Sequence, residues 1–133
     1  MSEKPVAAKL LIKDGAAVWS SHPERFAGLV GPLPPGAHAT DDLRAAGVAV
    51  AFADDAAAIR GILDANHDDL ALPAVLWVVY PKGNRTDVNR DSLWPILAEH
   101  GLRPITQVAV DETWSALRFR SLRPGESPFT GGA

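Results

Sequence analysis

One run of residues limits what this chain can fold into more than any other: residues 74–80, AVLWVVY. The run is rich in β-branched and aromatic residues, which favour strands. A strand with one face in water alternates apolar and polar residues, whereas this run is apolar throughout. Continuous apolarity is typical of a strand buried on both faces, so we predict a parallel sheet with this strand at its centre.

In the N-terminal half, strand-like patterns alternate with helix-like patterns. Extended segments are expected at residues 10–12, 16–20 and 48–52. The segment SHPE at 21–24 has the form of a capping box with proline in the first turn, so a helix should begin there. Two aspartates after the third apolar run are suited to cap a second helix over residues 56–66.

The C-terminal half predicts a helix and then a hairpin. A helix is expected over residues 92–100, with Pro95 tolerated only in its first turn. Residues 103–110 and 114–120 are alternating runs around a short turn, which indicates a β-hairpin. The whole order predicts a single compact three-layer Rossmann-like α/β domain, with a mostly parallel sheet that ends in an antiparallel hairpin.

Composition and charge set the limits of function. The chain has 133 residues, 47% of them hydrophobic and 22% charged, as in an ordinary globular domain. A net charge of -3 gives no reason to expect a nucleic acid or an anionic membrane as partner. No apolar run approaches the roughly 18 residues of a membrane span. With no signal-peptide pattern and no cysteine, we expect a cytoplasmic domain over 9–122, between flexible ends at 1–8 and 123–133.

The expected ligand site lies at the carboxyl ends of the parallel strands, where open α/β sheets bind their ligands. The loop over residues 80–91 would bind an anion through its cations and the N–H groups of the following helix. The alternative is an ordinary loop, with Asp87 and Asp91 neutralising two cations and Asn89 or Asp91 capping the helix. The candidate ligand-binding residues are Ser21, His22, Asp54, Tyr80, Lys82, Arg85, Asn89 and Arg90.

Other polar and aromatic residues favour structural roles. Ser21 is expected to cap a helix, and His22 is a candidate general base because its ordinary pKa lies near neutrality. Residues 67–69, His-Asp-Asp, are expected to form a solvated helix end, since consecutive residues do not converge on a metal, and no metal site is predicted. His38 and His100 have no partner at a suitable spacing. Trp19 and Trp77 are expected in the core, while Trp94 and Trp114 would lie in the core, at the loop-side pocket or at a subunit interface.

Two segments resemble a known family. Residues 74–95, which include the phrase YPKG, and residues 101–120, which include DETWSALRFR, are similar to small bacterial proteins that are frequent in actinobacteria. That family is known only as a domain of unknown function. The resemblance implies a compact Rossmann-like fold and no established activity.

The order of elements also resembles the S-adenosylmethionine-dependent methyltransferases, whose parallel sheet ends in an antiparallel hairpin. That resemblance implies a glycine-rich turn after the first strand, yet residues 19–26 read WSSHPERF and the next glycine is Gly28. It also implies an acidic residue at the end of the second strand, where residues 35–40 have none before Asp41. The chain therefore resembles this fold without the residues that usually bind the cofactor.

Three hypotheses follow for function. The first is a non-catalytic binding or regulatory module that recognises a small anionic ligand or a partner protein over residues 80–91, with help from Ser21, His22 and Asp54. The second is a degenerate nucleotide- or S-adenosylmethionine-related enzyme. The third is a structural protein-protein interaction domain, since an exposed edge strand in the terminal hairpin would favour a homodimer. Whether the chain is an enzyme, and which cofactor it would use, stays open at this point.

Overall fold

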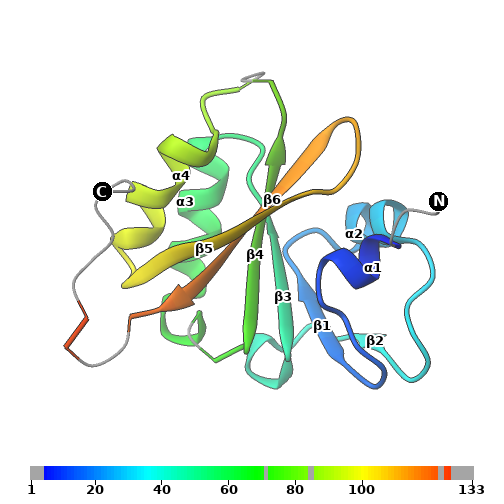
Figure 1. Ribbon diagram of the computed structural model, residues 1–133. Coiled ribbons are helices and arrows are strands. Elements are labelled where there is room, and N and C mark those ends of the chain that lie inside the picture. Colours follow the sequence, from blue (N-terminus) through cyan, green and yellow to red (C-terminus); the bar gives the residue numbers. More distant parts are fainter. Residues whose placement is uncertain (1–4, 71, 84–85, 123–124, 127–133) are drawn as a thin grey trace.

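The computed structural model describes residues 5–70, 72–83, 86–122 and 125–126. The strands are β1 (Ala17–Ser20), β2 (His38–Ala39), β3 (Val48–Phe52), β4 (Val75–Pro81), β5 (Leu102–Ala109) and β6 (Trp114–Ser121). They form one six-stranded sheet in the order β2-β1-β3-β4-β6-β5 (Figure 1). The first four of these are parallel, and β6 and β5 form the antiparallel end of the sheet. The predicted architecture is therefore confirmed.

Strand β4 is the centre of the sheet, as its apolar sequence predicts. It pairs in parallel with β3 and in antiparallel fashion with β6. Its side chains alternate between two cores: Leu76 and Val78 pack on one side of the sheet, and Trp77 and Val79 pack on the other. All four are at most 3% exposed, so both faces of the strand contribute to burial.

Helices cover both faces of the sheet (Figure 1). The helices are α1 (Val6–Lys9), α2 (Pro23–Val30), α3 (Ala56–Ala65) and α4 (Arg90–Ala98), with short 3-10 helices η1 (Leu43–Ala45) and η2 (His67–Asp69). Phe26 of α2 packs in the core that contains Trp77, whereas Ile59 of α3 and Leu93 of α4 pack in the core that contains Val78. Within the described residues no helix is long and apolar enough to cross a membrane.

The run at residues 10–12 was predicted as extended, and that prediction is wrong. Helix α1 ends there in a tight reversal: the Ile12 N–H donates to the Ala7 carbonyl (2.9 Å) and the Leu11 N–H donates to the Ala8 carbonyl (3.1 Å). Leu11 takes a left-handed backbone conformation, with φ 62°. This is the pattern of a helix C-terminal cap, and it buries Leu10 on one side of Leu11 and Ile12 on the other.

The start of α4 also differs from the prediction. The Ser92 N–H donates to the Asn89 side chain and the Asn89 N–H donates to the Ser92 hydroxyl, which makes a reciprocal capping box. Because this box satisfies the first turn, the helix begins at Arg90, two residues earlier than expected. Pro95 consequently lies inside the helix and not in its first turn.

Contacts outside residues 9–122 occur at both ends of the described chain. Ala7 of α1 is 3% exposed and packs in the core that contains Trp77. At the other end, the Glu126 carboxylate forms ion pairs with Arg103 and Arg120 at 2.8 and 2.7 Å.

Candidate functional site at the carboxyl edge of the sheet

The sheet has a switch in strand order between β1 and β3. After β1 the chain runs to β2 on one side, and it then returns to β3 on the other side. Open α/β sheets bind ligands at such a switch point, beyond the carboxyl ends of the two strands, and we call this place the crevice. The residues at this crevice come from the turn after β1, at 20–22, and from the turn after β3, at 53–55.

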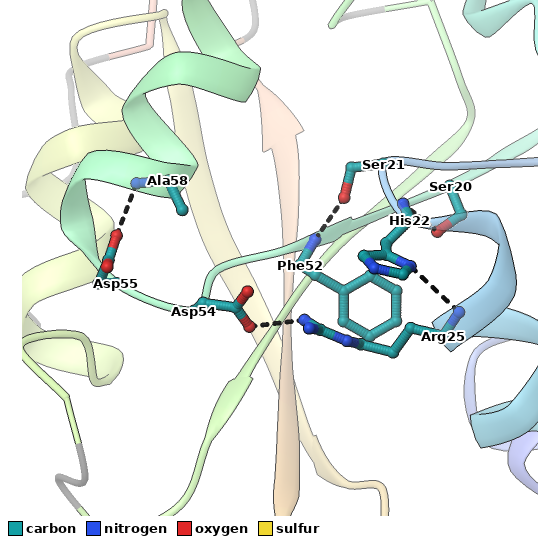
Figure 2. A network of polar contacts seen from close by, with 8 residues as sticks. All are labelled: Ser20, Ser21, His22, Arg25, Phe52, Asp54, Asp55 and Ala58. Carbon is teal, nitrogen blue, oxygen red and sulfur yellow. Dashed lines mark hydrogen bonds and ion pairs between the residues drawn. The ribbon is translucent and has the colours of Figure 1, made fainter.

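Ser21 and His22 hold the turn after β1 in place (Figure 2). The Phe52 N–H donates to the Ser21 hydroxyl oxygen (2.8 Å), and the Arg25 N–H donates to His22 Nδ1 (3.2 Å). His22 is thus the residue that caps α2, and the prediction that Ser21 caps it is wrong. The physical reason is that Ser21 lies one residue too early and turns instead toward the end of β3, where it ties the two turns together.

An ion pair crosses the crevice. Arg25 Nη1 lies 2.6 Å from Asp54 Oδ1, and the Arg25 guanidinium lies over the rings of Phe52 (5.4 Å) and Trp114 (5.5 Å). The two rings meet edge to face at 5.9 Å. Both charged side chains are partly exposed, at 31% and 50%, so the pair contributes at most about 1 kcal/mol. Asp54 was among the predicted site residues, and the loop side was one of the three places predicted for Trp114, whereas Arg25 was not predicted.

A small cavity lies beside the crevice, between α2 and strands β1 and β2. Its volume is about 110 Å³ and its lining includes Val18, Ser20, Phe26, Ala27, Leu33 and Thr40.

Strand β2 ends at Ala39, so Asp41 is the second residue beyond the strand. An acidic residue therefore does follow the carboxyl end of the second strand, directly after the segment 35–40 that the sequence assigned to this strand.

Tyr80 is enclosed at the end of β4. The Gln107 side-chain amide donates to the Tyr80 hydroxyl (2.7 Å), and Ser115 is a second hydrogen-bond partner. Burial raises the pKa of Tyr80 above its ordinary value, and these two hydrogen bonds lower it by less. Tyr80 is therefore a neutral phenol at physiological pH, joined to the terminal hairpin.

Much of the polar loop at residues 80–91 has a structural explanation. Asp87 Oδ1 accepts from the Ala56 N–H (2.8 Å) at the start of α3, and Asn89 caps α4. The Lys82 backbone N–H donates to the Thr113 carbonyl (2.8 Å). Arg85 lies outside the described residues. Arg90 is exposed and borders an open groove of about 330 Å³, with Thr106 and Gln107 on the other side.

The structure also brings together two histidines that lie far apart in the sequence. His67 Nδ1 and His100 Nδ1 lie 2.7 Å apart, and His100 Nε2 lies 3.7 Å from Asp64 Oδ1. No sequence spacing indicates these contacts, which form because α3 and α4 lie side by side and bring their ends together. Across the described ranges no group of three or more metal-ligating side chains is assembled.

Comparisons with known proteins support the fold and not a family. No model of a known protein family matches the chain, and no curated protein matches it in sequence. The resemblance to the actinobacterial family therefore stays a prediction. Among solved structures, a protein of the NADB-Rossmann superfamily from Streptococcus agalactiae matches with a TM-score of 0.59 and 12% identity, over 98% of this chain and 72% of that one.

Two further solved structures bear on the functional hypotheses. The tRNA methyltransferase TrmK of B. subtilis matches with a TM-score of 0.52 and 13% identity, over 91% of this chain and 67% of that one. Sp1610 of Streptococcus pneumoniae, solved in complex with S-adenosyl-L-methionine, matches with a TM-score of 0.51 and 14% identity, over 91% and 73% of the two chains. A Rossmann-like, methyltransferase-like fold is confirmed. Both neighbours are methyltransferase structures, so the first hypothesis, a non-catalytic binding module, is corrected.

Proposed function

We propose that the protein is an enzyme of the S-adenosylmethionine-dependent methyltransferase class, with its cofactor across the carboxyl ends of β1 and β3. The observation that carries this proposal is the Arg25–Asp54 pair, which stands at the switch point of the sheet. The solved methyltransferases of the same fold, one of them with bound S-adenosyl-L-methionine, support it.

The charges of the pair fit the amino-acid end of the cofactor. That end carries a carboxylate and an ammonium group, and Arg25 presents a planar fork suited to the first while Asp54 suits the second. Each residue would exchange its present partner for a group of the same charge. Because Arg25 and Asp54 are partly exposed, opening the pair costs at most about 1 kcal/mol.

The rest of the crevice fits parts of the cofactor. Asp41 and Thr40 follow β2 and would accept hydrogen bonds from ribose hydroxyls. The cavity beside α2, about 110 Å³, is below the roughly 300 Å³ of an ordinary ligand pocket, so the cofactor would lie largely on the open edge. The turn after β1 lacks the glycines of a cofactor-binding turn. Its shape is held instead by the Ser21 and His22 side chains, which accept from the backbone N–H groups of Phe52 and Arg25.

The chemistry of the class is transfer of a methyl group, which the bound cofactor supplies as an electrophile. The protein's own contribution would be to hold and orient the bound cofactor. Phe52 and Trp114 present aromatic faces where the Arg25 cation now lies, and such faces also favour the positive charge of a sulfonium. Tyr80 is buried in the core on the other face of the sheet from Phe52 and Trp114, so its part would be to hold the terminal hairpin through Gln107.

Calorimetric titration with S-adenosylmethionine and S-adenosylhomocysteine tests the proposal. Both should bind the wild-type protein, and Arg25→Ala should weaken binding at least about tenfold, a loss of roughly 1.4 kcal/mol. Arg60→Ala is the matched control, because Arg60 forms a comparably exposed ion pair with Glu99 away from the crevice. Absence of binding to either compound at millimolar concentration would refute the proposal, as would equal losses in both variants.

A further inference from the structure

The amino edge of the sheet, opposite the crevice, has an open cavity of its own. Its volume is about 390 Å³, within the usual range of roughly 300–1,000 Å³ for small-molecule sites. It lies where the chain enters the parallel strands, since Ala16, Gly47 and Ala74 immediately precede β1, β3 and β4. Strand β4 has seven residues and separates the two edges by about 20 Å, at roughly 3.3 Å per residue.

The walls of this cavity are apolar, but its charges are all positive. Leu11, Val48 and Val75 provide the apolar wall, and Lys13 and Arg118 provide the cations. Within the part of the chain that the structure describes, no carboxylate pairs with either cation, Asp14 included. Cations beside a concave apolar surface match an anion that carries an apolar body.

Arg118 has hydrogen-bonding capacity left over. Its Nη2 donates to the Ala74 carbonyl at 3.5 Å, the limit of a hydrogen bond. Its Nε is buried, and among the described residues no acceptor reaches it. The buried Nε is out of a ligand's reach, but the guanidinium lines the cavity and its terminal nitrogens have donors left for an oxygen acceptor.

Leu11 supplies an independent observation. The cap of α1 needs a left-handed residue at this position, where glycine is the usual choice. The fold therefore requires the turn but gains nothing from a leucine in it. The Leu11 side chain is 39% exposed and lies on the rim of the cavity. A strained, exposed leucine at a rim is explained if its side chain covers a ligand.

We propose that this cavity binds a small carboxylate with an aliphatic or aromatic body. The carboxylate would accept from Arg118 and lie close to Lys13, and the body would pack on Leu11, Val48 and Val75. The apolar wall excludes a bare inorganic anion as the preferred ligand, because such an ion would leave that wall in water. This site is distinct from the cofactor crevice and does not depend on the methyltransferase assignment.

The test is a titration followed by amide NMR, with hexanoate and phenylacetate as probes. Both should give saturable shifts at Ala16, Gly47 and Ala74, while hexanamide, which has the same body without the charge, and inorganic phosphate should give none. Arg118→Gln and Lys13→Gln should each weaken hexanoate binding at least about tenfold. Arg44→Gln, at a surface pair on η1, should leave it unchanged.

Leu11→Gly separates a ligand role from a structural one. This change keeps the left-handed turn, so the melting temperature should hold or rise while hexanoate binding weakens. The proposal is overturned if hexanoate gives no saturable shift up to about 10 mM, which is already a weak affinity. It is also overturned if hexanamide or phosphate binds as well as hexanoate, or if Leu11→Gly leaves the affinity for hexanoate unchanged.

Discussion

The two edges of the sheet treat their charged residues in opposite ways. At the carboxyl edge, Arg25 is paired with Asp54, and Asp87 is bonded to the start of a helix. At the amino edge, Lys13 and Arg118 face a cavity with no described carboxylate against them. A ligand at the first edge must replace contacts that the protein already makes, whereas a ligand at the second edge adds contacts that are missing. A high density of polar residues in the sequence therefore does not identify the more open of the two sites.

The largest effect is expected for Trp77, which lies on β4 between the two edges. Trp77 is 1% exposed in the middle of β4, and its indole N–H donates to the Leu10 carbonyl (2.8 Å). Trp77→Ala should lower the free energy of unfolding by about 3–5 kcal/mol through lost packing and a cavity. Urea denaturation measures the change, with Trp19→Ala, at a partly buried position on β1, as the comparison of smaller effect. Similar losses in both variants would contradict a core centred on β4.

The carboxyl edge should then respond to loss of its helix cap. Asn89→Ala removes the acceptor for the Ser92 N–H and half of the capping box, so it should cost about 1 kcal/mol, within a range of roughly 0.5–2. Asp68→Ala, an exposed residue of η2, should be neutral in the same urea experiment. A neutral Asn89→Ala would mean that the loop before α4 is not held by its cap.

The difference between the edges is tested most directly by removing one arginine from each. Arg25→Met should lower the free energy of unfolding by about 0.2–1 kcal/mol, because it breaks a partly exposed ion pair. Arg118→Met should be neutral or stabilising, because it removes a cation without a carboxylate and a buried N–H without an acceptor. High salt should reduce only the first effect. Equal destabilisation by both changes would remove the distinction drawn between the edges.

The smallest effect is confined to alkaline solution. The pKa of Tyr80 is raised by burial, so the unfolded chain releases the phenol proton at lower pH than the folded chain does. Stability from this group is complete below the unfolded value of about 10 and is lost as pH rises through the folded pKa. Because Tyr80 is the single tyrosine, tyrosinate absorbance reports its titration alone. In Tyr80→Phe the alkaline loss of stability should be smaller, and an unchanged loss would point to another group.

Periodicity in the sequence predicts the sheet well because burial on two faces leaves a direct pattern. Residues 74–80 gave the position of β4, and the alternating runs gave β5 and β6. The same reasoning fails at residues 10–12, since three apolar residues suit a strand as well as a buried helix end. The hydrogen bonds that decide between them involve residues 7 and 8 and are not visible in the apolar pattern.

The candidate site was predictable in position and not in its contacts. The rule for parallel sheets places Asp54 and Tyr80 at one edge, and the structure agrees. The partner of Asp54 is Arg25, which lies 29 residues away on α2, and the partner of His67 is His100, 33 residues away. Pairs of this kind depend on how helices pack, which a single sequence does not encode in any local spacing.

The bond between the Trp77 indole and the Leu10 carbonyl has a consequence for the order of folding. It joins residues 67 positions apart, so the loop it closes is among the longest in the chain. Closing a long loop costs entropy that is recovered only when both ends have a surface to pack on. We therefore expect β3, β4 and the hairpin to assemble first and the N-terminal segment to dock last. Tryptophan emission responds to the surroundings of the indole, so a variant that keeps Trp77 as its single tryptophan would report that final step.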